Sequence, residues 1–156
     1  MKKMFALLVA IALIAPVLMA QTVHDEIALT RAQIQADRQA IVAASLGLTE
    51  AQGTVFWPIY REYRQAMDKP ADRLWALMTK YGASWDAMHN DDAKAALNEW
   101  LEAERDAVQI KQKYAKRFAK ELGGITAARF FQIDNKLDTI IRLEAAGGIP
   151  LVEAKK

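Results

Sequence analysis

Residues 46–63, LGLTEAQGTVFWPIYREY, combine a helix start, a proline and an apolar face in one stretch. Thr49 as N-cap and Gln52 three residues later form a capping box, in which each side chain accepts a hydrogen bond from the other residue's backbone N–H. Leu48, just before the cap, can pack back onto the first turns. The stretch therefore predicts a long helix that begins at Thr49.

Pro58 stands inside this predicted helix. Because proline has no backbone N–H and its ring clashes with the carbonyl of Thr54, it costs ~3 kcal/mol in a helix interior or produces a kink. Two interpretations remain open: a helix that bends near residues 54–58, or a separate short turn followed by a helix that begins at Pro58. Pro70 leaves the same choice between a new helix and a second bend.

Apolar spacings of three, four and seven predict four helices and no strand. The first runs over 23–45 on a thin stripe of Ile27, Ile34 and Ile41, and the second ends at Gly82. The third begins after Asn90 as N-cap and stops at the Gly123-Gly124 pair. Its predicted apolar face consists of Ala93, Leu97, Trp100, Leu101, Val108, Tyr114, Phe118 and Leu122.

The fourth predicted helix starts near Thr126 and ends at Gly147-Gly148, before a short apolar tail over 149–152 that should pack back or meet a partner. The expected fold is all-α: a long antiparallel helical hairpin with a flanking helix at each end, curved by its prolines. A compact four-helix bundle is the alternative.

The first twenty residues resemble a secretory signal peptide. Lys2 and Lys3 precede an apolar run over 4–17, and Ala20 ends a small-residue cleavage site. The run is shorter than the ~20 residues that a spanning helix needs, which favours cleavage over an uncleaved membrane anchor. Residues 21–156 are then expected to form a single exported domain in the periplasm.

Charge and composition exclude several kinds of function. The chain has 21 Lys and Arg against 19 Asp and Glu, and removal of Lys2 and Lys3 makes it formally neutral. A general attraction to nucleic acid is therefore not expected. The chain has no cysteine, which excludes thiol catalysis and cysteine zinc sites. His24 and His89 lie beside acids and indicate at most weak metal binding, so we expect no enzyme, cofactor or metal site.

Two surfaces are candidates for binding clients or a partner. Trp57 and Trp75 are five helical turns apart, so in one continuous helix they share a line, and their neighbours on that side are Arg61, Arg64, Asp68 and Asp72. Met78, from the apolar face of the same helix, is a further candidate for client contact. Both indoles could instead lie flat at the edge of the core. The second candidate is a basic patch in the latter half of the third helix, which could meet acidic clients or lipid headgroups, or simply complement the helix dipole. Its members are Lys113, Lys116, Arg117 and Lys120.

The segment Leu48-Thr-Glu-Ala-Gln52 resembles the LTxxQ motif of the Spy/CpxP family of periplasmic proteins. Ile125 and Thr126 open a degraded second copy, in which Arg129 stands where the glutamine would be. The stretch over 128–152 is similar to the C-terminal end of exported bacterial proteins of unassigned function, which suggests an uncharacterised branch of this family.

The resemblance implies a homodimer of helical hairpins that forms a curved cradle. The family includes an ATP-independent chaperone and a stress-response protein that damps a sensor kinase. The chain departs from the family pattern in two ways: it lacks a histidine-rich zinc segment, and its mature part is neutral where known members are basic. The sequence thus predicts a non-enzymatic envelope protein that holds unfolded clients on an amphipathic surface. The alternative is a regulatory or structural accessory protein that docks on one envelope partner, such as a membrane sensor.

Overall fold

The computed structural model describes residue 33 and residues 36–82 and 88–147, and these ranges contain helices and no strand. Four helices make up this part of the chain: the helix over 36–46, α2 (Glu50–Gly82), α3 (Asn90–Leu122) and α4 (Gly124–Gly147). The predicted all-α class with four helices is confirmed. The chain forms two compact units, Met1–Ala44 and Ser45–Lys156, and the second contains all of α2, α3 and α4.

The first helix ends where the sequence predicted. Helical structure stops at Leu46, and Gly47 adopts a φ of 61°, a left-handed conformation that ends a helix at little cost only in glycine. Ile41 is 43% exposed. Ile27 and Ile34, the other two members of the predicted stripe, lie outside the described residues.

The capping box of α2 is confirmed. The backbone N–H of Thr49 donates to Gln52 Oε1 at 3.0 Å, and the N–H of Gln52 donates to Thr49 Oγ1 at 3.3 Å. These bonds satisfy two donors that a helix start would otherwise leave without partners. The helix then runs unbroken from Glu50 to Gly82 through both Pro58 and Pro70.

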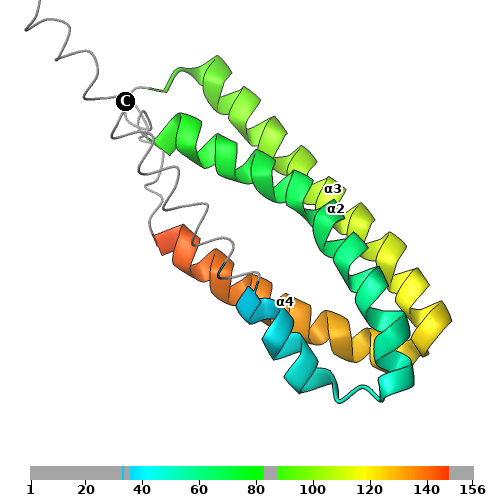
Figure 1. Ribbon diagram of the computed structural model, residues 1–156. Helices are drawn as coiled ribbons and strands as arrows, with labels where there is room; N and C mark the ends of the chain where they lie inside the picture. The colour runs from blue at the N-terminus through cyan, green and yellow to red at the C-terminus, as the bar shows by residue number, and fades with distance from the viewer. Residues whose placement is uncertain (1–32, 34–35, 83–87, 148–156) are drawn as a thin grey trace, which may run out of the picture. The chain divides into compact units, whose positions relative to one another are not determined.

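The continuity of α2 decides between the two interpretations of its prolines. Neither proline begins a new helix, and Figure 1 shows α2 bowing along its length. Pro58 and Thr54 are both exposed, so water can reach the Thr54 carbonyl that proline leaves without a helical donor.

The boundaries of α3 and α4 correct two predictions. His89, with φ −84° and ψ 157°, occupies the N-cap position of α3 and makes no side-chain capping bond, so Asn90 is the first helical residue. Gly123, with φ 85°, ends α3, and its N–H donates to the Ala119 carbonyl at 3.1 Å. Its own carbonyl accepts from Ala127 at 3.1 Å, so α4 begins at Gly124 and Thr126 lies inside its first turn.

Helices α2 and α3 form the predicted antiparallel hairpin, and α4 folds back along α3 (Figure 1). Ion pairs fix the register of the hairpin: Arg117 binds Glu62 near one end, and Arg73 binds Asp106 at 2.7 Å farther along. The register is antiparallel because residue numbers rise on one helix as they fall on the other.

An aromatic cluster forms the core where all three helices meet. Phe118 lies 4.7 Å from Phe130 and 5.2 Å from Phe56 between ring centroids, and all three are fully buried. The Tyr63 ring packs 5.7 Å from Phe130 in an edge-to-face arrangement. Such pairs add ~0.5–1.5 kcal/mol each beyond the burial of their area. This cluster anchors α4 against the hairpin.

Farther along the hairpin, α2 and α3 pack through small side chains of α3. Ala96, Ala103 and Ala107 are buried, whereas Leu97 and Leu101 are about half exposed. The predicted face of α3 is therefore wrong at Leu97, Trp100, Leu101 and Val108, which are 45–53% exposed, and is confirmed at Tyr114 and Phe118, which are buried. Alanines allow the two helix backbones to approach closely and turn the larger neighbouring side chains out of the interface.

Candidate binding surface

Helix α4 covers only part of the hairpin. Along α3, Phe118 meets Phe130, Lys111 binds Asp138 at 2.7 Å and Glu104 binds Arg142 at 2.8 Å. Continuing this register for five residues, about 7.5 Å at 1.5 Å per residue, places the end of α4 level with Glu99 and Trp100. The hairpin beyond that level is not covered by α4.

The uncovered part carries large apolar side chains on the same side as α4. Leu97, Trp100 and Leu101 precede Glu104 by seven, four and three residues, so they share a helix face with the residue that binds α4. Their exposed fractions are 53%, 45% and 50%. We call these three residues, together with Trp75 of α2, the outer apolar face.

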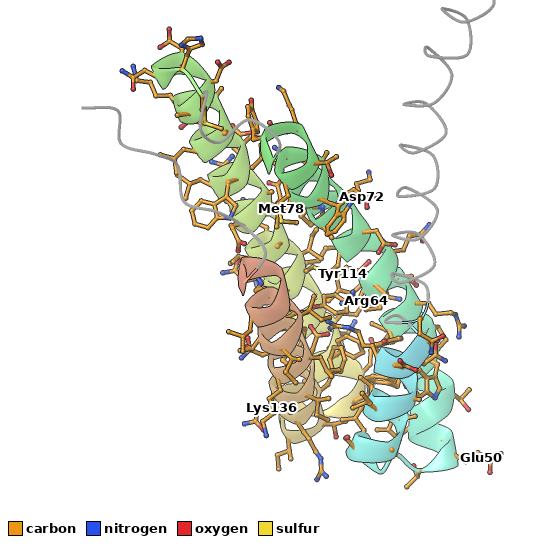
Figure 2. The ribbon with its side chains drawn as sticks, turned by 90° about the vertical axis from the view of Figure 1, so that its left-hand side faces the viewer. Glu50, Arg64, Asp72, Met78, Tyr114 and Lys136 are labelled. Carbon is orange, nitrogen blue, oxygen red and sulfur yellow. The ribbon has the colours of Figure 1, made fainter. Side chains whose placement is uncertain are left out.

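Trp75 belongs to this face because it lies on the side of α2 that carries a residue in contact with α4. It follows Arg64 by eleven residues, about three turns, and Arg64 lies 3.6 Å from Asp134 of α4. Trp75 is 38% exposed. Figure 2 looks onto this side of the hairpin, with half-buried Met78 between α2 and α3 beyond the end of α4. The outer apolar face is therefore a two-helix surface.

The opposite side of the hairpin is polar and closed by ion pairs. Arg73 of α2 binds both Asp106 at 2.7 Å and Glu102 at 3.1 Å. Glu62 and Arg117 form a two-bond pair, and this hydrogen bonding lowers the pKa of Glu62 and raises that of Arg117. Exposed pairs of this kind contribute little to stability. Their main consequence is a charged side opposite the apolar one.

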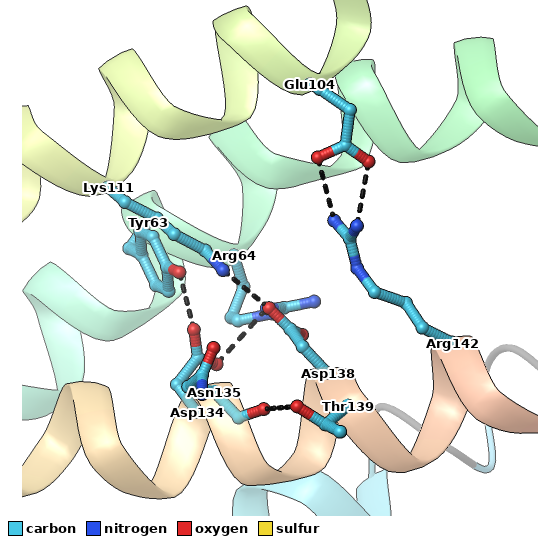
Figure 3. A network of polar contacts seen from close by, with 9 residues as sticks. All are labelled: Tyr63, Arg64, Glu104, Lys111, Asp134, Asn135, Asp138, Thr139 and Arg142. Atoms are coloured by element: carbon cyan, nitrogen blue, oxygen red, sulfur yellow. Dashed lines mark hydrogen bonds and ion pairs between the residues drawn. The ribbon is translucent and has the colours of Figure 1, made fainter. Parts of the chain in front are cut away.

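A network of polar contacts joins α4 to α2 and α3 (Figure 3). Tyr63 donates a hydrogen bond to Asp134 at 2.6 Å, and Asp134 is fully buried. Burial, followed by the charge and hydrogen bond of Asp134, raises the pKa of Tyr63 well above its usual range. Lys111 and Asp138 extend the network along α4. These groups hold α4 at a fixed position, which fixes where the apolar face begins.

The tryptophans predicted as a contact line have different surroundings. The Trp57 ring packs edge-on against Phe56 at 5.0 Å and Tyr60 at 5.4 Å, so it lies at the edge of the core. Trp75 is more exposed and belongs to the outer apolar face. Arg61 is exposed one turn after Trp57. Of the two tryptophans on this line of α2, Trp57 therefore packs against the core and Trp75 lies on the surface.

The predicted basic patch is partly engaged in contacts within the chain. Lys113 lies 5.5 Å from the Tyr114 ring centroid, and Arg117 binds Glu62. Lys120 is 82% exposed and lies 3.8 Å from Glu121, and Lys116 is exposed. The motif residues Ile125 and Thr126 lie at the opposite end of α4 from the outer apolar face, and Ile125 is 89% exposed.

The α3 part of the outer apolar face is not predicted from the sequence, because the apolar spacing puts Leu97, Trp100 and Leu101 on the buried side. The spacing of the alanines contained the signal. Ala96, Ala103 and Ala107 continue at helical spacing into Tyr114 and Phe118, and these five are the buried residues of α3. A stripe of small residues that continues into large apolar residues on the same helix face therefore indicates the face that packs against the neighbouring helix.

The described residues give no sign of a metal centre or a membrane span. Nowhere in 36–82 or 88–147 do three His, Asp or Glu side chains gather closely enough to hold a metal ion. In the same ranges, no helix combines the length and hydropathy needed to cross a bilayer. His24 lies outside the described residues.

Comparison of the chain with family models, with curated proteins and with solved structures found no match.

Proposed function

We propose that this chain is an exported, non-enzymatic binding protein of the bacterial envelope that holds partly unfolded proteins on its outer apolar face. One observation carries the proposal: Trp75, Leu97, Trp100 and Leu101 are between 38% and 53% exposed on one side of a two-helix surface. Large exposed apolar side chains gathered on one side of a protein are typical of interaction sites. The signal-peptide pattern over 1–20 supports export to the periplasm.

The chemistry of the face suits clients of varied sequence. Indole rings and leucine side chains give apolar contact in many orientations, and Met78 at its edge is adaptable because its chain is unbranched. Burial of apolar area provides ~25 cal/mol per Å², so a partial contact holds a client reversibly. Such binding needs no nucleotide. The charged side of the hairpin keeps the chain soluble while the apolar side is occupied.

The test is light scattering of an aggregating client protein with the mature chain at a two-fold molar excess. We expect the wild type to suppress scattering and the double variant Leu97→Ser/Leu101→Ser to lose most of that suppression. Both leucines are half exposed, so the variant retains its fold, which circular dichroism checks. Ile125→Ser is the matched control, because Ile125 is 89% exposed at the other end of α4. Equal suppression by all three chains, or none by the wild type, would refute the proposal.

A pull-down from periplasmic extract separates this function from the alternative of an accessory protein. A spread of captured proteins that disappears with Leu97→Ser/Leu101→Ser supports client holding. A single stoichiometric partner would instead indicate docking on one envelope component. On the resemblance to the LTxxQ family, we also propose that the mature chain is a homodimer. Sedimentation equilibrium, which measures the mass of the mature protein in solution, tests this.

A further inference from the structure

The hairpin contains two separate apolar clusters. The aromatic cluster described above lies where α2, α3 and α4 meet. The second, which we call the outer cluster, consists of Leu77, Tyr81 and Ala96, each 7–8% exposed, with half-buried Met88 packed against them. Helix α4 ends before the level of Ala96, so it does not cover this cluster. The outer cluster is therefore packed between the ends of two helices, whereas three helices bury the aromatic cluster.

The part of the hairpin between the two clusters is weakly held. Pro70 lies inside α2 and is buried, and it donates no hydrogen bond to the carbonyl of Ala66. Ala66 is half-buried, so water reaches this carbonyl less readily than it reaches the carbonyl of exposed Thr54. On the other helix, Ala103 and Ala107 are buried, but a methyl group has little apolar area to bury. A missing helical bond in α2 therefore coincides with a contact that α3 makes through small side chains.

Arg73 joins the two helices at this junction. It lies three residues after Pro70 and binds Asp106 at 2.7 Å and Glu102 at 3.1 Å, which places Pro70 level with Ala107 in the antiparallel register. The Arg73 side chain is 36% exposed, so water screens both ion pairs. On the outer side of this junction, these ion pairs and the packing of the outer cluster hold α2 and α3 together.

We propose that the outer part of the hairpin, residues 71–82 and 88–101, opens as a unit while the aromatic cluster stays folded, and that the outer cluster then becomes a second contact surface for unfolded clients. Proteins open locally, without global unfolding, where few apolar groups are buried. The first part of the proposal concerns the chain alone, and the second rests on the proposed client-holding function. Opening adds Leu77, Tyr81 and Met88 to the apolar surface that a client can contact.

Hydrogen exchange of the mature chain, read by mass spectrometry at several low urea concentrations, tests the opening. Backbone amides in 71–82 and 88–101 should exchange through a local opening, which exposes little surface and therefore responds weakly to urea. Amides in 52–68 and 107–135 should exchange only through global unfolding, with a steep response to urea. The same steep response in both sets would overturn the proposal, because the hairpin would then unfold as one unit.

Two matched variants sharpen the exchange experiment. Arg73→Gln removes the ion pairs to Glu102 and Asp106, so it should accelerate exchange of the outer amides about fivefold, the effect of losing two partly exposed pairs. Arg117→Gln removes the two-bond pair with Glu62 at the other end of the hairpin and should leave exchange of the outer amides unchanged. Equal acceleration of the outer amides by both variants would overturn a separate opening. Circular dichroism verifies that each variant is folded.

Two buried tyrosines test the client contact. Tyr81 in the outer cluster is 7% exposed, and Tyr114 in the aromatic cluster is 6% exposed. Each is replaced in turn by para-azidophenylalanine, and the mature chain is irradiated with an unfolding client. We expect several times as many client adducts at position 81 as at position 114, because only the outer cluster opens while the rest stays folded.

The combined results separate this inference from the proposed function. Local opening with equal adducts at positions 81 and 114, or with none at position 81 while the wild type suppresses client scattering, would overturn the second contact surface and leave the client-holding function standing. Local opening without adducts or suppression of scattering would mean that the client-holding function fails, and the second contact surface with it, while the opening holds.

Discussion

Replacement of Tyr63 by phenylalanine removes one hydroxyl from the centre of the molecule. That hydroxyl donates a 2.6 Å hydrogen bond to Asp134, whose side chain is fully buried, and it joins α2 to α4 across 71 residues of sequence. The phenyl ring keeps the contacts with Phe130 and Phe118. The variant therefore isolates the hydrogen bond from the packing.

The expected loss is about 2 kcal/mol, because hydrogen bonds to charged groups contribute ~1.5–3 kcal/mol. Asp134 retains Arg64 at 3.6 Å, which keeps the loss below the ~3–5 kcal/mol of a buried charge stripped of its partner. Urea unfolding followed by circular dichroism measures it. Tyr114→Phe is the matched control: Tyr114 is 6% exposed and packs 5.5 Å from Tyr63 between ring centroids, but it is not part of the Tyr63–Asp134 hydrogen bond. The control should lose less than about 0.5 kcal/mol.

The same residue predicts an alkaline transition. Burial raises the pKa of Tyr63 in the folded chain above the 10.0 of a free tyrosine. The stability linked to this group is thus complete below pH ~10 and is lost as pH rises from there toward the folded pKa, since the unfolded tyrosine releases its proton first. Tyr63→Phe should flatten this decline relative to the wild type. Equal stability of Tyr63→Phe and Tyr114→Phe at pH 7, or the same slope above pH ~10 in Tyr63→Phe and the wild type, would refute the reasoning.

Three further substitutions test the helix boundaries and the proline, each by urea unfolding. Thr49→Ala removes one half of the capping box and should cost ~1 kcal/mol, whereas Thr54→Ala, inside the same helix, should cost less than half of that; equal losses would contradict the capping role. Gly123→Ala should cost ~1 kcal/mol, since alanine is strained at the φ of 85° found there; an unchanged midpoint would show that this conformation is not required. Pro58→Ala should raise stability by about 1–3 kcal/mol, because alanine restores a helical N–H to α2; a loss would mean that the bend at Pro58 is needed for packing.

The helix ends were predictable wherever the signal is local. Thr49 and Gln52 bond to each other over three residues, and Gly47 and Gly123 adopt the backbone conformations for which glycine is suited. The start of α3 was misplaced by one residue, because Asn90 is a favourable cap by type while His89 holds the position without a capping bond. The capping preferences of residue types therefore locate a helix end approximately, but they do not identify the residue at which it falls.

The features that depend on distant contacts were not predictable from the sequence. From the sequence alone, Asp134 is expected to be an exposed acid. Only the packing of α4 against Tyr63 buries it and makes it a hydrogen-bond acceptor. From the sequence alone, Leu97 and Leu101 are expected to be core residues. They are exposed because α2 packs against the alanines of α3. In both cases, the position of the neighbouring helix determines whether the side chain is buried or exposed.

Site-specific photocrosslinking shows which surface of the chain a client touches. A photoreactive amino acid is placed at position 97 or at position 125 of the mature chain, and each protein is irradiated with an unfolding client. Both native residues are more than half exposed, at 53% and 89%. We expect adducts with the client at position 97 and few at position 125. Equal adducts at both positions, or none at position 97, would contradict the claim that clients are held on the outer apolar face.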